Sequence, residues 1–150
     1  MAYIDVVTLA EAKQFLRVDD GFTADDTLIT LHINTAGEYV ERHTNQMLYS
    51  RNKDYVVVDG EKRVYDTPIT AVVDPASADD YEVAQYETYR VYSASQDTIT
   101  LTVGYDVADV PAGLKMEMLK IIDAKYHGND EVGDFDEIDA RLSKYKRHII

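Results

Sequence analysis

Hydrophobic residues in the first third of the chain recur at the spacing of an α-helix. The pattern predicts a short helix over residues 8–17, opened by Thr8 and Glu11 at the spacing of a capping box. It predicts a longer helix over residues 24–47, with Thr23 as the N-cap. The apolar positions that share one face of the longer helix are Ile29, Ile33, Ala36, Val40 and Met47. Two helices are therefore expected at the start of the fold.

The middle of the chain changes to the spacing of β-strands. An apolar run at residues 55–58 is followed by the turn signal Asp59-Gly60, which predicts a hairpin with residues 62–65. Further strands are predicted over residues 69–73, 86–92 and 98–103. The last of them places Ile99, Leu101 and Val103 on one face and Thr98, Thr100 and Thr102 on the other. That alternation is typical of a strand with one buried face.

A third helix is predicted over residues 112–127, with an apolar stripe formed by Leu114, Met118, Ile121 and Ile122. Six acidic side chains lie in residues 128–139 and four basic ones in residues 140–148, and such separated blocks indicate an arm outside the core. The expected fold class is α+β and mainly helical, with two N-terminal helices, one C-terminal helix, a small antiparallel β-sheet between them and an extended C-terminal tail. Residues 1–127 are expected to form the domain and residues 128–150 the arm.

Composition narrows the classes of function. The chain has 150 residues, which fits one domain, and 28 acidic against 15 basic residues give a formal charge of −13. That charge argues against a protein that grips a phosphate backbone by itself. Cysteine is absent, which excludes disulfides, thiolate metal sites and a cysteine nucleophile. No apolar run approaches the length of a membrane span, and the N-terminus lacks the features of a signal peptide.

Candidate chemistry is sparse. His32 and His43 lie about 16 Å apart on the predicted long helix, too far to share a zinc ion, and His127 and His148 are remote in sequence. No phosphate-binding loop, dinucleotide fingerprint or nucleophile elbow occurs, and no pair of carboxylates is marked by a motif. We therefore expect no catalytic residue, cofactor or metal. A small hydrolase that uses unmarked carboxylates and a cytosolic interaction domain remain as alternatives.

An ordered set of short motifs carries a resemblance to a known family. It comprises Thr8–Lys13, Leu16–Asp19, Asp26, Leu28-Ile29, Ile33, Ala36, Tyr39–Glu41, Thr44, Leu48, Pro68-Ile69, Thr102–Tyr105, Val110-Pro111, Leu114-Lys115 and Tyr126. In this order the chain resembles the head–tail connector, or head-completion adaptor, family of tailed bacteriophages.

The resemblance implies a non-enzymatic structural protein of the virion, made in the bacterial cytoplasm and located in the neck. Its expected partners are the portal protein, a stopper or tail-completion protein, and further copies of itself in a ring that commonly has twelve subunits. Genomic double-stranded DNA would pass through without specific binding, and no membrane is involved. An acidic channel wall would keep the duplex from adhering, although surface acidity also serves solubility. The alternative within this class is another neck or tail-completion protein.

Two sets of residues are candidates for these contacts. Tyrosine is abundant, at 12 residues, and its apolar ring with a polar tip suits interfaces. The expected subunit contacts are Tyr39, Arg42, Tyr86, Tyr89 and Tyr92. The expected portal-binding residues of the arm are Arg141, Leu142, Lys144, Tyr145, Lys146, Arg147, Ile149 and Ile150.

Overall fold

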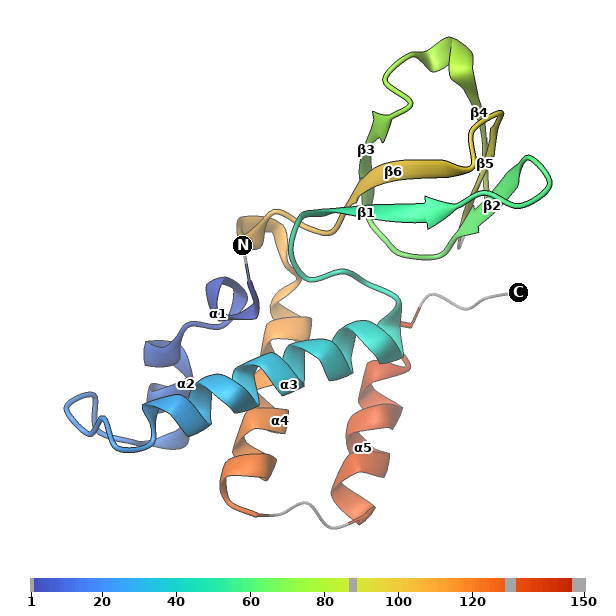
Figure 1. The fold of residues 1–150 in the computed structure, drawn as a ribbon. Helices are drawn as coiled ribbons and strands as arrows, with labels where there is room; N and C mark the ends of the chain where they lie inside the picture. Colours follow the sequence, from blue (N-terminus) through green and yellow to red (C-terminus); the bar gives the residue numbers. More distant parts are fainter. Residues whose placement is uncertain (1, 87–88, 129–131, 147–150) are drawn as a thin grey trace.

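The computed structural model describes residues 2–86, 89–128 and 132–146, and it places a module of short strands on one side of a layer of helices (Figure 1). The helices are α1 (Tyr3–Val6), α2 (Leu9–Leu16), α3 (Asp26–Thr44), α4 (Ala112–Tyr126) and α5 (Val132–Leu142). The strands are β1 (Arg51–Val56), β2 (Glu61–Val64), β3 (Ile69–Asp74), β4 (Tyr81–Gln85), β5 (Arg90–Ala94) and β6 (Thr98–Val103). Short 3₁₀ turns η1 (Ala78–Asp80) and η2 (Val107–Asp109) complete the chain. The expected α+β class is confirmed.

Helix α3 lies at the centre of the helical layer and contacts the other four helices. Its predicted stripe of Ile29, Ile33, Ala36 and Val40 is fully buried, and it packs with the stripe of Leu114, Met118, Ile121 and Ile122 on α4. The predicted bounds of the helix are less accurate. Asp25, not Thr23, occupies the N-cap position, and α3 ends at Thr44 because Asn45 adopts a left-handed conformation with φ 58°. Met47 consequently lies beyond the helix and packs in the sheet core.

The connection between α2 and α3 is fixed by a buried lysine. The capping box of Thr8 and Glu11 starts α2 as predicted. The Lys13 side chain is 4 % exposed, and its Nζ donates to the carbonyl oxygens of Asp20 (3.0 Å) and Phe22 (2.7 Å) and to Asp26 Oδ1 (2.9 Å). These three bonds use all three ammonium protons, so the loop is tied to both helices.

The strands form two antiparallel sheets of three strands each, in the orders β1-β6-β3 and β2-β5-β4. Strand β6 shows the predicted alternation: Ile99, Leu101 and Val103 are fully buried, whereas the threonines face outward. The three buried residues of β6 pack with Tyr55, Val64, Ile69 and Tyr92 in a core separate from the helical one. The module therefore has its own apolar centre.

The predicted hairpin of residues 55–58 with residues 62–65 is wrong. The turn itself forms, because Asp59 and Gly60 both take positive φ (54° and 80°) and Val58 bridges Glu61. Beyond that single bridge β1 pairs with β6 and β2 pairs with β5. Backbone bonds from Val57 N–H to Asp97 O (2.9 Å) and from Ala94 N–H to Gly60 O (3.1 Å) replace the expected hairpin ladder. Partners remote in sequence outcompete the local one.

The C-terminal segment also differs from the expected extended tail. Residues Val132–Leu142 form α5, and Ile138 and Leu142 belong to the helical core. Arg141 Nε donates to Glu117 Oε2 on α4 (2.8 Å), and the Tyr145 carbonyl accepts a bond from Gln46 Nε2 (2.6 Å). The reason is that Ile138 and Leu142 lie four residues apart on one face of α5, where both reach the helical core. Ile138, Leu142 and Tyr145 therefore pack on the helical core.

Candidate interaction surfaces

The described residues hold no arrangement suited to a metal. Among them no group of three or more histidine, aspartate or glutamate side chains converges on one point. His43 stacks on the Tyr39 ring and His127 pairs with Asp123 (3.0 Å), so each is held by a neighbour on its own or the adjoining turn. No helix in residues 2–86, 89–128 and 132–146 combines the length and apolarity that crossing a bilayer requires.

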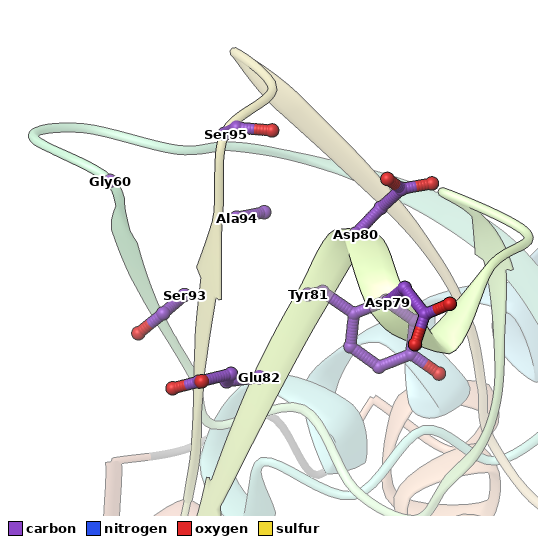
Figure 2. Close-up of a pocket in the computed structure, with 8 residues that line it drawn as sticks. All are labelled: Gly60, Asp79, Asp80, Tyr81, Glu82, Ser93, Ala94 and Ser95. Carbon is purple, nitrogen blue, oxygen red and sulfur yellow. The ribbon is translucent and has the colours of Figure 1, made fainter.

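A shallow depression lies between β4, η1 and β5. It is lined by Gly60, Asp79, Asp80, Tyr81, Glu82, Ser93, Ala94 and Ser95. Figure 2 shows Asp79 and Asp80 on one side of β4 and Glu82 directed toward the other side, so the carboxylates do not face a common centre. No histidine or lysine lies among these lining residues to serve as a base partner or an anion ligand. The depression presents acidic surface rather than a catalytic constellation.

The junction between the helices and the sheets is organised around one buried carboxylate. Glu41 is 6 % exposed. Its Oε1 accepts from Arg51 Nη1 (2.9 Å) and from the Leu48 backbone N–H (2.8 Å). Its Oε2 accepts from Arg51 Nη2 (2.6 Å) and from the Tyr3 hydroxyl (2.8 Å). One side chain thus joins α1, α3, the connection after α3 and β1.

Tyr3 and Tyr55 have their pKa raised by burial and by a hydrogen bond to a carboxylate. Burial, followed by the hydrogen bond to Glu41, raises the pKa of Tyr3 well above its ordinary value. Burial, followed by the hydrogen bond to Asp66 (2.6 Å), raises the pKa of Tyr55 in the same way. The bond to Glu41 in turn raises the pKa of the Arg51 guanidinium. The folded state therefore favours the neutral phenols and the charged guanidinium.

These shifts predict the alkaline behaviour of the chain. A folded pKa above the unfolded value of about 10 contributes stability that is complete below pH 10 and is lost as the pH rises toward the folded pKa. In a titration of tyrosinate absorbance, Tyr3 and Tyr55 should ionise only with unfolding, and Tyr3→Phe and Tyr55→Phe should each remove one late-titrating group. Ionisation of all 12 tyrosines as one class while circular dichroism still reports a folded chain would contradict this expectation.

An aromatic cluster lies at one end of the β2-β5-β4 sheet, formed by residues that follow β2 and β4 and precede β5. The rings of Tyr86 and Tyr89 stack with centroids 4.7 Å apart, and Tyr65 lies 5.3 Å from Tyr89. The Arg63 guanidinium carbon is 5.8 Å from the centre of the Tyr89 ring. Tyr86 is 53 % exposed. Tyrosine and arginine are enriched at the energetic centres of interfaces, so this cluster is suited to contact another protein.

The five residues expected at subunit contacts lie in different environments of the fold. Tyr86 and Tyr89 lie together in the aromatic cluster, and Arg42 is exposed on α3. Tyr92 is 1 % exposed in the sheet core, because β5 turns this side chain inward, and it is therefore not a surface residue. Tyr39 is half-buried against the helical core, and its hydroxyl donates to Asp139 Oδ1 (2.5 Å).

The expected portal-binding residues are separated in the same way. Leu142 is fully buried, Arg141 pairs with Glu117 and Glu137, and Tyr145 is half-buried against the start of α4, where a Cβ added at Gly113 would meet its hydroxyl. Lys144 and Lys146 are exposed. Arg147, Ile149 and Ile150 lie outside the described residues. Arg141, Leu142 and Tyr145 are therefore engaged in contacts within the subunit.

Sequence reasoning missed the Glu41–Arg51 junction and the exposed apolar residues at the start of α3. No local signal marks Glu41, since its partners come from three other parts of the chain. Leu28 and Leu31 carry a usable signal, because they fall off the buried stripe of α3, and they are 44 % and 59 % exposed. Apolar residues outside the core stripe of an amphipathic helix indicate a contact made by the surface.

The described surfaces offer candidate protein contacts at the aromatic cluster and at the start of α3. A family model described as "Phage gp6-like head-tail connector protein" matches residues 6–106, about two thirds of the chain. The chain therefore belongs to this family of head–tail connectors, whose members are structural virion proteins rather than enzymes.

Two solved structures share the fold. One is described as "Neck of empty GTA particle computed with C6 symmetry", with a TM-score of 0.76 and 16 % identity. The other is described as "Virion of native gene transfer agent (GTA) particle", with a TM-score of 0.72 and 17 % identity. Each match covers 100 % of this chain and 94 % of the other. No curated protein matches the sequence. At these identities the likeness concerns the fold.

Proposed function

We propose that this chain is an adaptor subunit in the neck of a phage-like particle. It docks on the portal protein, extends the channel for DNA and offers a platform to a stopper or tail-completion protein. The observation that carries the proposal is the family match over residues 6–106, and the whole-chain likeness to a chain from a gene transfer agent neck supports it. The neck is accordingly the proposed location.

A ring of identical subunits is the proposed assembly, with the twelve copies that the resemblance to head–tail connectors implies. Such a ring closes when one surface of each subunit binds a different surface of the next. Arg42 and the cluster of Tyr86 and Tyr89 supply exposed residues for these contacts. Tyr92 is not proposed again, because it is buried.

The portal contact is assigned to the end of the chain. Arg141, Leu142 and Tyr145 are engaged within the subunit. The segment of residues 147–150, with Arg147 and two terminal isoleucines, is therefore the proposed portal-binding part. Basic and apolar residues together can supply charge complementarity and an apolar anchor.

The acidity of the chain fits passage of DNA. The acidic depression of Asp79, Asp80 and Glu82 and a formal charge of −13 disfavour lasting contact with phosphates. Duplex DNA is proposed to pass without specific binding.

Deleting residues 147–150 tests the portal assignment. We expect the shortened chain to fold normally, since Leu142 and Tyr145 are retained, and to lose co-sedimentation with portal-bearing capsids that lack necks. Lys62→Glu, a charge reversal on β2, is the matched control and should co-sediment like the unaltered chain. Equal co-sedimentation of the deletion variant would overturn the portal assignment, and failure of the unaltered chain to bind such capsids would count against the adaptor function.

A further inference from the structure

Helix α3 has surfaces of opposite character at its two ends. At its start, Phe22, Leu28 and Leu31 are 47 %, 44 % and 59 % exposed, and the exposed Asp19 and Asp20 precede Phe22 on the loop from α2. We call these five residues the acidic–apolar end. Large apolar side chains that gather on a rigid surface with a charged rim are typical of a protein contact.

The acidic–apolar end is held in place before any partner binds. Lys13 donates to the carbonyl oxygens of Asp20 and Phe22 and to the Asp26 carboxylate, and its ammonium is buried. The loop is thus fastened at two of its own carbonyls and to the first residue of α3. A preorganised loop loses little conformational entropy on binding, which favours association.

The other end of α3 carries exposed cations: Arg42 on its last turn, and Lys144 and Lys146 after α5. The two lysines flank Tyr145, whose carbonyl accepts from Gln46 Nε2 (2.6 Å) just beyond the end of α3. Gln46 Oε1 in turn accepts from the Tyr105 hydroxyl (2.6 Å). We call Arg42, Lys144 and Lys146 the basic end. The half-buried Tyr39 precedes Arg42 by three residues on α3, and the half-buried Tyr145 lies between the two lysines in the sequence.

The two ends are far apart. The 19 residues of α3 span about 28 Å at 1.5 Å per residue. Figure 1 shows the α2–α3 loop at one extreme of the helical layer and the end of α5 at the other. Arg17 at the acidic–apolar end and Glu38 and Asp139 at the basic end carry the opposite charge, and Asp139 is engaged by the Tyr39 hydroxyl and His43. The bonds of Lys13 and of the Tyr145 carbonyl hold the backbone of the two ends. The surfaces are complementary and not identical, which suits a head-to-tail contact rather than a two-fold one.

We propose that the acidic–apolar end of one copy docks on the basic end of the next copy and forms the repeated contact of the ring. The proposal rests on the proposed adaptor function and names the residues of its self-association. Burial of Phe22, Leu28 and Leu31 supplies the affinity, and the opposite charges set the register and the direction. Lys144 and Lys146 are accordingly proposed to contact the neighbouring subunit, and residues 147–150 remain the proposed portal contact.

Cross-linking tests this contact cleanly, because the chain contains no cysteine. The double variant Asp20→Cys, Lys146→Cys, assembled into particles and treated with a short bismaleimide, should give a ladder of dimers, trimers and larger species up to the full ring. Each single variant should remain monomeric on the same gel. Neck rings visible by electron microscopy without a ladder would overturn the contact and leave the adaptor function standing. A chain missing from the neck would overturn the adaptor function.

A charge exchange provides a second readout. Lys144→Glu with Lys146→Glu should lower incorporation into particles by about tenfold, through repulsion across each contact. Adding Asp19→Lys and Asp20→Lys to the same chain should restore it, whereas Lys62→Glu alone should not change it. Thermal unfolding of each variant checks that the subunit still folds. Loss without restoration in a folded chain would contradict the proposed pairing.

Discussion

Replacing Glu41 with alanine should lower the free energy of unfolding of the isolated chain by about 3 kcal/mol, because it leaves buried partners without an acceptor. Glu41 satisfies the Arg51 guanidinium, the Leu48 backbone N–H and the Tyr3 hydroxyl. Removing one member of a buried pair costs more than the pair itself contributes, since the remaining charge stays in a poorly solvated place. Urea unfolding followed by circular dichroism measures the difference.

Glu38→Ala is the matched control for this variant. Glu38 lies on the same helix, one turn earlier, and is exposed, so its replacement should change the free energy of unfolding by no more than about 0.5 kcal/mol. Equal free energies of unfolding for the two variants would show that the Glu41 junction does not stabilise the folded chain. The double variant Glu41→Ala, Arg51→Ala should recover part of the loss, because it removes the stranded charge along with its partner.

The Glu41 junction also bears on the proposed ring. The helical layer and the sheet module have separate apolar cores, and Glu41 ties α1 and α3 to the start of β1. The ends of α3 lie in the helical layer, whereas the aromatic cluster of Tyr86 and Tyr89 lies on the sheets. If both surfaces contact neighbouring subunits, their relative position determines whether the ring closes, and the junction fixes that position.

The features that could be predicted from the sequence are those set by local periodicity. The alternation of β6 and the buried stripes of α3 and α4 follow directly from the spacing of apolar residues, and the structure confirms them. The capping box of Thr8 and Glu11 is likewise a contact within four residues. The turn at Asp59-Gly60 forms as predicted, but its strands pair elsewhere, because strand partners depend on contacts remote in sequence.

The candidate surfaces were predictable to a similar degree. Tyr86 and Tyr89 are indeed brought together near the surface, whereas Tyr92 turns into the core, because alternate residues of a strand face opposite sides and the sequence did not show which side was covered. Helix α5 was missed because blocks of charge concealed the spacing of Ile138 and Leu142. A short amphipathic helix needs few apolar residues when it covers an existing core.

Leu142→Ala should destabilise the chain by about 3 kcal/mol, the usual cost of removing a fully buried leucine side chain and leaving a cavity. Lys144→Ala, two residues later and exposed, is the control and should stay within about 0.5 kcal/mol of the unaltered chain. Urea unfolding distinguishes a packed helix from a detachable arm, since an arm would make both substitutions neutral.

The same substitution connects stability to assembly. Leu142 holds the end of α5 in the helical core, and Tyr145 then docks on Gln46 and positions Lys144 and Lys146. Leu142→Ala should therefore also weaken the ladder formed by Asp20→Cys with Lys146→Cys at temperatures where the chain is still folded. A strong loss of stability with an unchanged ladder would mean that the basic end is positioned by the neighbouring subunit and not by α5.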